Sequence, residues 1–184
     1  MKLLELFSGS GRLGRLAESA GWEVISLDSS KKCPSTITED ILDWDYRALD
    51  FIPDWIHASP PCTEYSTSNT CGIRNLDLAD NIVNKTLEII EFFRGENPNL
   101  KITIENPASG MLPKRGIIDL PFHVISYCKY GATWRKNTQI WNNLGEYWRP
   151  HPICKYDCAS TVPGMLGRWR HLDRKSTRLN SSHA

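Results

Sequence analysis

The stretch Leu6–Gly14 reads LFSGSGRLG, and it decides the fold of this chain. The apolar run Lys2–Phe7 leads into it and predicts a buried strand. The stretch Arg12–Ala20 follows with apolar residues at helical spacing, and Gly21 ends that helix. A strand, a tight glycine-rich turn and a helix in this order are typical of the first unit of an α/β fold.

Further apolar runs alternate with helical segments along the chain. The pattern predicts one long helix at Leu76–Phe93, where apolar residues follow the spacing of a single helix face. It also predicts strands at Val24–Leu27, Ser35–Thr38, Trp55–Ala58, Lys101–Glu105, His123–Tyr127 and Gln139–Asn142, the last two forming a hairpin-like edge. We therefore expect an α/β, Rossmann-like fold with a mostly parallel sheet, helices on both faces and functional sites at the carboxyl ends of the strands.

Length and composition limit the classes of protein to which this chain can belong. The chain has 184 residues, of which 40% are hydrophobic and 23% charged, so a single globular domain is expected and a disordered or fibrous protein is not. No apolar run is long enough to span a membrane, and Glu5 interrupts the first run too early for a signal peptide. We expect an intracellular monomer without a membrane partner, whose six cysteines act as thiols or ligands.

Charge is distributed unevenly along the sequence. Residues 1–128 carry a net charge of −6 and residues 129–184 a net charge of +7. Four tryptophans lie within the basic part: Trp134, Trp141, Trp148 and Trp169. A basic segment with interspersed aromatic residues is typical of nucleic-acid binding. The alternative is that the tryptophans belong to the core and the charges to a solvated face.

The glycine turn predicts a site for a nucleoside cofactor. Gly9, Gly11 and Gly14 match the GxGxxG pattern between a strand and a helix, and Asp28 ends the next strand 19 residues after Gly9. Glycines let the backbone approach a ligand, and a carboxylate at that position accepts hydrogen bonds from ribose hydroxyls. The pattern alone fits a nicotinamide dinucleotide and S-adenosylmethionine equally well, and a purely structural turn is the alternative.

Two reactive side chains follow later strands. Cys62 comes after two prolines at the end of the predicted strand Trp55–Ala58, and Glu105 ends the strand Lys101–Glu105. A thiol and a carboxylate at neighbouring strand ends suit attack on an electron-poor ring followed by methyl transfer. The alternatives are a buried apolar cysteine and a carboxylate bonded to nearby backbone.

Together these segments resemble the ordered motifs of the DNA cytosine-5 methyltransferases. The resemblance covers residues 2 to about 142 and implies that family's sheet, with S-adenosylmethionine as methyl donor. The matching segments are Leu6–Gly11, Asp28, Asp40-Ile41, Pro61-Cys62 with Ser66, and Glu105-Asn106-Pro107.

The resemblance also implies roles for individual residues. Cys62 is the expected nucleophile toward C6 of a cytosine flipped out of the duplex, and Glu105 is expected at N3 of that ring. Asn106 and Pro107 are expected to shape their loop. The residues expected to bind the cofactor are Phe7, Ser8, Gly9, Gly11, Asp28, Asp40, Ile41 and Pro61, with Asp28 at the ribose and Asp40 and Ile41 at the adenine.

The sequence departs from the family pattern after Tyr130-Gly131. Trp134 stands where the family has a glutamine, and Lys136 and Thr138 stand where it has arginines. We expect Arg135 or Lys136 to contact the phosphate of the flipped nucleotide, although lysine cannot reproduce a bidentate guanidinium contact.

The C-terminal part lacks the family's long recognition region and its last two motifs. This predicts either a minimal form with little sequence specificity or a shortened chain. We expect a catalytic domain over residues 1–148, a short basic lobe over 149–173 and a disordered, non-native tail over 174–184. Cys154 and Cys158, with His151 and His171 as further candidates, have spacing that suits zinc, and unpaired thiols are the alternative.

The expected function is methyl transfer to C5 of cytosine in DNA, as in restriction–modification or other DNA methylation. One rival keeps the chemistry and replaces DNA by tRNA, since a short recognition region suits a substrate that is read by shape. Another is a catalytically silent protein that still binds nucleic acid or cofactor. A third alternative is a nicotinamide oxidoreductase, but Cys62 and Glu105 would have no role in such an enzyme.

Overall fold

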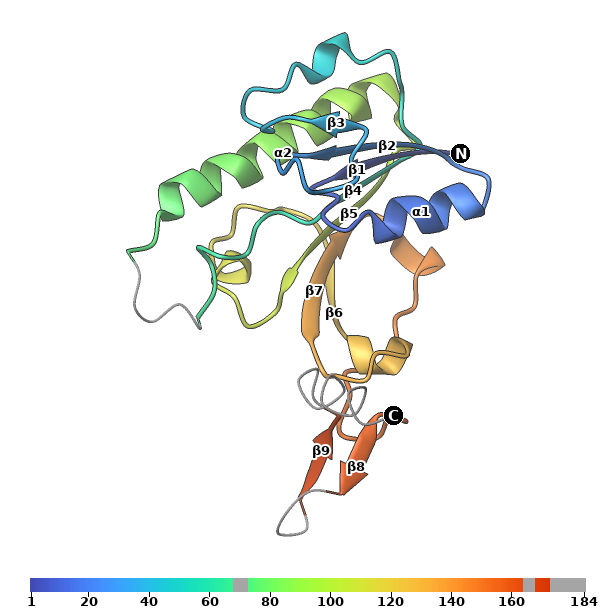
Figure 1. The fold of residues 1–184 in the computed structure, drawn as a ribbon, viewed down its shortest axis with the longest axis vertical. Helices are drawn as coiled ribbons and strands as arrows, with labels where there is room; N and C mark the ends of the chain where they lie inside the picture. Colours follow the sequence, from blue (N-terminus) through green and yellow to red (C-terminus); the bar gives the residue numbers. More distant parts are fainter. Residues whose placement is uncertain (68–72, 164–167, 173–184) are drawn as a thin grey trace.

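A seven-stranded sheet forms the centre of the computed structural model, which describes residues 1–67, 73–163 and 168–172 (Figure 1). The strand order is β3-β2-β1-β4-β5-β7-β6. The strands are β1 (Lys2–Leu6), β2 (Glu23–Asp28), β3 (Ile37–Thr38), β4 (Trp55–Ala58), β5 (Lys101–Pro107), β6 (Phe122–Ser126) and β7 (Asn137–Asn142). The first five are parallel, and β7 runs antiparallel to both β5 and β6. The predicted mostly parallel α/β sheet is confirmed, including the antiparallel edge.

Two α-helices cover opposite faces of this sheet (Figure 1). Helix α1 (Arg12–Ser19) follows the glycine turn, and α2 (Leu76–Glu96) begins where the Asn75 side chain accepts a hydrogen bond from the Leu78 amide. Shorter 3₁₀ turns are η1 (Tyr46–Ala48), η2 (Leu112–Lys114), η3 (Tyr127–Tyr130) and η4 (Gly145–Tyr147). Among the described residues, no helix is both long enough and apolar enough to cross a lipid bilayer.

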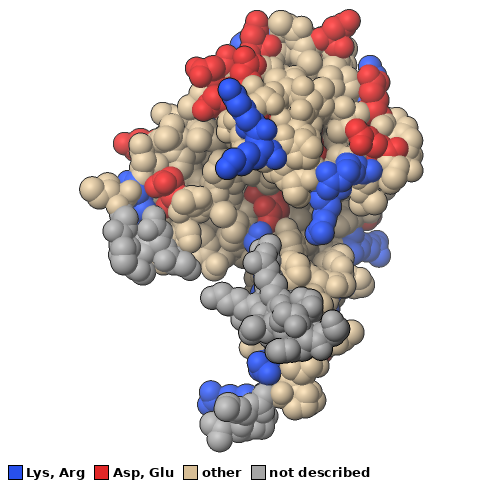
Figure 2. All heavy atoms as spheres, in the orientation of Figure 1, with Lys and Arg blue, Asp and Glu red and all other residues tan. Residues whose placement is uncertain are grey.

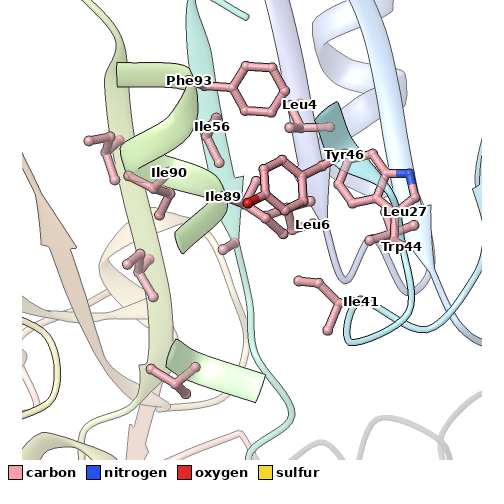
Figure 3. Close-up of a cluster of buried hydrophobic side chains, with 14 of the residues drawn as sticks. Leu4, Leu6, Leu27, Ile41, Trp44, Tyr46, Ile56, Ile89, Ile90 and Phe93 are labelled. Carbon is pink, nitrogen blue, oxygen red and sulfur yellow. The ribbon is translucent and has the colours of Figure 1, made fainter. Parts of the chain in front are cut away.

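The hydrophobic core lies between the sheet and α2 (Figure 3). Leu4 and Leu6 of β1 point to this side because alternate residues of a strand share a face, and they meet Ile89 and Phe93 of α2. Tyr46 closes the same cluster, and its hydroxyl donates to Glu88 Oε1 at 2.6 Å. This packing fixes the carboxyl ends of β1, β2 and β4 relative to one another.

The face that carries α1 keeps an open apolar groove. Its volume is about 400 Å³, and it runs between α1 and the strands β4, β5 and β7. The lining includes Leu16, Trp22, Trp55, Ile140 and Trp148. A groove of this composition does not suit a polar cofactor.

A small hairpin extends the C-terminal lobe beyond the sheet (Figure 1). Strands β8 (Thr161–Pro163) and β9 (Trp169–His171) pair antiparallel as a separate two-stranded sheet. The sequence pattern did not predict them, because three residues are too few for apolar alternation to be recognised. The tail predicted over residues 174–184 lies outside the described residues.

Candidate functional site

The glycine turn joins the end of β1 to α1 through left-handed backbone. Phe7, Gly9 and Gly11 have φ angles of 62°, 52° and 63°. For Phe7 this conformation costs about 1–2 kcal/mol, and such strain is concentrated at functional sites. The Gly9 amide donates to Asp28 Oδ2 at 2.8 Å, so the turn is tied to the end of β2.

A buried carboxylate holds the third glycine of the turn. The Gly14 amide donates to Glu5 Oε2 at 3.0 Å, and burial raises the pKa of Glu5 above its usual range. The sequence motifs do not point to Glu5. An acidic residue inside the apolar run Lys2–Phe7 was the available sign, since buried carboxylates need a partner.

A shallow pocket of about 60 Å³ lies beside this turn. Five of the eight predicted cofactor-binding residues line it: Phe7, Asp28, Asp40, Ile41 and Pro61. They come from four separate segments, which the parallel sheet brings to one edge. The remaining lining residues are Leu27, Ser29, Glu39 and Ile82.

The other three predicted cofactor-binding residues lie in the turn itself. Ser8 is buried, and its hydroxyl has no hydrogen-bond partner among the described residues. At Gly11 an added Cβ would lie 3.1 Å from Pro34 Cγ. The carboxylates and apolar side chains that line the pocket fit a nucleoside, with oxygens available for ribose hydroxyls and carbon for a base.

The loop that carries Cys62 is held from two sides. The Ser59 hydroxyl donates to the Phe7 carbonyl at 3.0 Å, and Asn106 Nδ2 donates to the Pro60 carbonyl at 2.9 Å. Asn106 is fully buried, so this bond is shielded from water. Cys62 itself is exposed. Asn106 therefore contacts the loop of Cys62, a contact that the sequence did not predict.

The segment after Cys62 is anchored by Tyr65. This side chain is fully buried, its hydroxyl donates to Asp80 Oδ1 at 2.8 Å, and burial raises its pKa. The Tyr65 carbonyl accepts from the Met111 amide at 2.8 Å, and Arg115 forms an ion pair with Asp80. These contacts hold the chain next to Cys62 against α2 and η2.

Glu105 sits at the carboxyl end of β5 with two donors on one oxygen. Its Oε1 accepts from the Tyr127 hydroxyl at 2.9 Å and from Lys136 Nζ at 3.1 Å. The side chain is 15% exposed. Burial, and then the charge of Glu105, raise the pKa of Tyr127, so that tyrosine stays protonated as a donor. Tyr127 is not predicted from the sequence, because it belongs to no motif and lies 22 residues beyond Glu105.

The two cations predicted for phosphate contact point to different places. Lys136 forms its ion pair with Glu105. The Arg135 guanidinium lies 5.4 Å from the centre of the Tyr156 ring, toward the C-terminal lobe. The structure therefore brings Lys136, and not Arg135, to the carboxylate.

The predicted metal ligands Cys154 and Cys158 lie together with two further residues. Their sulfurs, the sulfur of Cys128 and a ring nitrogen of His171 all lie within 4.8 Å of one another. His151 is not in this group, and its ring packs 5.1 Å from that of Tyr130. Cys128 was missed because it precedes Cys154 by a long stretch of chain.

Comparisons with known proteins support this architecture. The chain matches the structure of the Entamoeba histolytica methyltransferase EhMeth with a TM-score of 0.51 and 16% identity, over 83% of this chain and 56% of that one. The chain has the fold of a methyltransferase.

Two other solved structures match with lower scores. A putative methyltransferase from Thermoplasma acidophilum has a TM-score of 0.42 and 13% identity, over 77% of this chain and 66% of that one. The CcbJ methyltransferase of Streptomyces caelestis has a TM-score of 0.39 and 14% identity, over 67% of this chain and 49% of that one. The chain thus spans about half to two thirds of these structures. No protein-family model matches it, and no curated protein does.

Proposed function

We propose that this chain transfers a methyl group from S-adenosylmethionine to C5 of cytosine in DNA. The observation that carries the proposal is the position of Pro61, which lines the nucleoside pocket and directly precedes Cys62. Asn106 ties the same loop to the strand end that carries Glu105. A nucleoside pocket, a thiol and a carboxylate thus belong to one edge of the sheet.

The pocket residues fit the proposed methyl donor. Asp28 would accept hydrogen bonds from the ribose hydroxyls, and Asp40 and Ile41 would contact the adenine, beside the apolar surface of Phe7. S-adenosylmethionine supplies an electrophilic methyl group on a sulfonium. The loop from Pro60 to Cys62 would bring the thiol beside the methyl donor, because Pro61 lines the pocket and Cys62 directly follows it.

Cys62 is the proposed nucleophile. Its thiolate forms a bond to C6 of a cytosine swung out of the duplex, because that ring atom cannot be reached within stacked bases. The electron pair of the C5–C6 double bond would then attack the methyl carbon from C5, and the bond from that carbon to the sulfonium would break to leave S-adenosylhomocysteine. Loss of the C5 proton to a base and cleavage of the S–C6 bond restore the aromatic ring and release Cys62.

Glu105 is the proposed partner of the ring nitrogen N3. Negative charge moves toward N3 and O2 when the thiolate adds, and a proton shared between Glu105 and N3 offsets it. Tyr127 and Lys136 both donate to Oε1, and we assign the other oxygen, Oε2, to the base. Tyr127 and Lys136 are therefore positioning residues.

The basic C-terminal lobe is the proposed nucleic-acid contact. Arg168, Trp169 and Arg170 are exposed on and beside β9, and Lys and Arg side chains lie over this hairpin in Figure 2. Exposed cations and an aromatic ring on one short element suit phosphates and an unstacked base.

The first test is transfer of labelled methyl from S-adenosylmethionine to unmethylated DNA and, in parallel, to tRNA. We expect 5-methylcytosine in DNA from the wild-type chain, loss of transfer in Cys62→Ser, and unchanged transfer in Cys33→Ser, a thiol outside the site. Cofactor binding should persist in both variants, which separates loss of chemistry from loss of folding.

Two results would contradict the proposal. Label in tRNA alone would show that the chain methylates tRNA and not DNA. Binding of the cofactor without transfer to either polymer would identify a catalytically silent protein, and the catalytic assignment of Cys62 would be withdrawn.

A further inference from the structure

We propose that Cys128, Cys154, Cys158 and His171 form a structural zinc site that fixes the β8–β9 hairpin to the catalytic sheet. The four ligand atoms lie within 4.8 Å of one another, and Cys154 Sγ lies 3.3 Å from His171 Nε2. A tetrahedral zinc ion with Zn–S bonds of about 2.3 Å and a Zn–N bond of about 2.0 Å needs S···S and S···N separations of roughly 3.5–3.8 Å. The cluster therefore has the size of a four-ligand zinc site.

The ligands come from separate segments that meet at one point. Cys128 lies in η3, directly after β6, and His171 ends β9. The Cys154 amide donates to Ser126 Oγ at 3.0 Å, which brings the segment before β8 against the end of β6. A metal at this point would link the main sheet to the small one.

The cysteines present the donors that zinc prefers. Three thiolates and one imidazole form a Cys₃His set, which is common in structural zinc sites, and none of the three cysteines is in a disulfide. Cys128 and Cys154 are buried, whereas Cys158 and His171 are partly exposed. A closed set of four protein ligands leaves no open position, which indicates a structural and not a catalytic ion.

The lobe needs such a link because it has almost no core. Within its described residues, 149–163 and 168–172, only Cys154 and Ser160 are buried. A two-stranded hairpin of three-residue strands is not stable by itself in water. Units of this size are stabilised by metals, disulfides or packing onto a larger body.

The site also connects the hairpin to the proposed catalytic carboxylate. Cys128 directly follows Tyr127, whose hydroxyl donates to Glu105. On the other side, His171 directly follows Arg170, one of the exposed cations of β9. A metal at this position would hold both the Glu105 donor and the basic hairpin in place. Only this functional consequence rests on the proposed function; the metal site itself does not.

The experiment measures metal content and metal spectroscopy on the full chain. Protein purified without chelator should contain one zinc ion per chain by plasma mass spectrometry. After replacement of zinc by Co²⁺, it should show the thiolate charge-transfer and intense visible bands of tetrahedral cobalt with sulfur ligands. Removal of the metal should lower the midpoint of thermal unfolding, and added Zn²⁺ should restore it.

Matched variants identify the ligands. Cys128→Ser and His171→Ala should lose the metal or bind it at least tenfold more weakly, whereas Cys33→Ser and His151→Ala should keep it. If a ligand variant fails to fold, the cobalt spectrum of the wild-type chain still tests the coordination.

Three results would overturn the proposal. They are a wild-type chain that takes up no stoichiometric zinc even after refolding with Zn²⁺, a cobalt spectrum without thiolate bands, and a disulfide between two of the three cysteines in protein purified under reducing conditions. Equal loss of metal in His151→Ala and His171→Ala would also count against this ligand set.

Discussion

His57 is a titratable residue inside the sheet. It lies on β4, and its Nδ1 is 2.9 Å from the hydroxyl of Thr103 on β5. Removal from water lowers the pKa of His57 to about 4, although the charge of Glu105 acts in the opposite direction. The histidine is therefore neutral in the folded protein near pH 7.

This pKa predicts a loss of stability in mild acid. An unfolded histidine has a pKa of about 6.5, so between about pH 6.5 and pH 4 the unfolded state binds more protons and the free energy of unfolding falls as pH falls. We expect His57 to contribute a loss of about 2 kcal/mol between pH 7 and pH 5. Urea unfolding of the wild-type chain and of His57→Gln at the two pH values measures the difference.

The control is His123→Gln. His123 is exposed on β6 and packs against Trp148, with ring centres 5.2 Å apart. His57→Gln should flatten the pH dependence of unfolding relative to this control. Equal pH dependence in the wild-type chain and His57→Gln would contradict the assignment.

At the scale of elements, the two α-helices each contain a glycine with a different role. In α1 an added Cβ at Gly14 would lie 2.7 Å from Glu5 Oε2, the oxygen that accepts the Gly14 amide. In α2 an added Cβ at Gly95 would meet nothing within 4 Å. A side chain at position 14 would therefore crowd Glu5 of β1, whereas a side chain at position 95 would meet no neighbour.

The same substitution should have opposite effects in the two helices. Gly14→Ala displaces a buried carboxylate from its partner and should lower the free energy of unfolding by about 1–3 kcal/mol. Gly95→Ala should raise it by up to about 1 kcal/mol, because alanine favours the helix and restricts the unfolded chain. Urea denaturation measures both, and a Gly14→Ala variant as stable as Gly95→Ala would show that Glu5 does not constrain α1.

At the scale of the whole molecule, the acidic and basic parts of the sequence form different elements. The acidic part, residues 1–128, contains β1 to β6, and the basic part contains β7 and the hairpin beyond the sheet. Figure 2 shows Asp and Glu together with Lys and Arg over the upper part of the molecule, and Lys and Arg without Asp or Glu at its foot, over the hairpin. Such a distribution orients a polyanion toward one end of the molecule.

This arrangement predicts which cations govern the salt dependence of DNA binding. Replacing Arg168 and Arg170 together by glutamine should weaken binding and reduce the slope of log affinity against log salt by about 2, because each lost phosphate contact removes about 0.9. Replacing the exposed Lys31 and Lys32, near the opposite edge of the sheet, removes the same charge and should change the slope little. Fluorescence anisotropy at several salt concentrations measures both, and equal slopes for the two double variants would contradict the proposed DNA contact.

The sequence by itself determined the parts of the protein that depend on local order. The strands of the seven-stranded sheet, both α-helices and the glycine turn followed from apolar spacing and glycine positions, because these features act over a few residues. Asp28, Cys62 and Glu105 were predicted to lie at one edge because the carboxyl ends of parallel strands meet there. That expectation did not require knowledge of any side-chain contact.

Only the tertiary structure decided which distant residues meet. The bonds from Asn106 to Pro60 and from Tyr127 to Glu105 join residues 46 and 22 positions apart. They depend on the register between β4 and β5 and on the antiparallel return of β6 and β7. Cys128 joins Cys154 for the same reason. Apolar periodicity shows which face of an element is buried, but the partner across that face is fixed only when the elements pack.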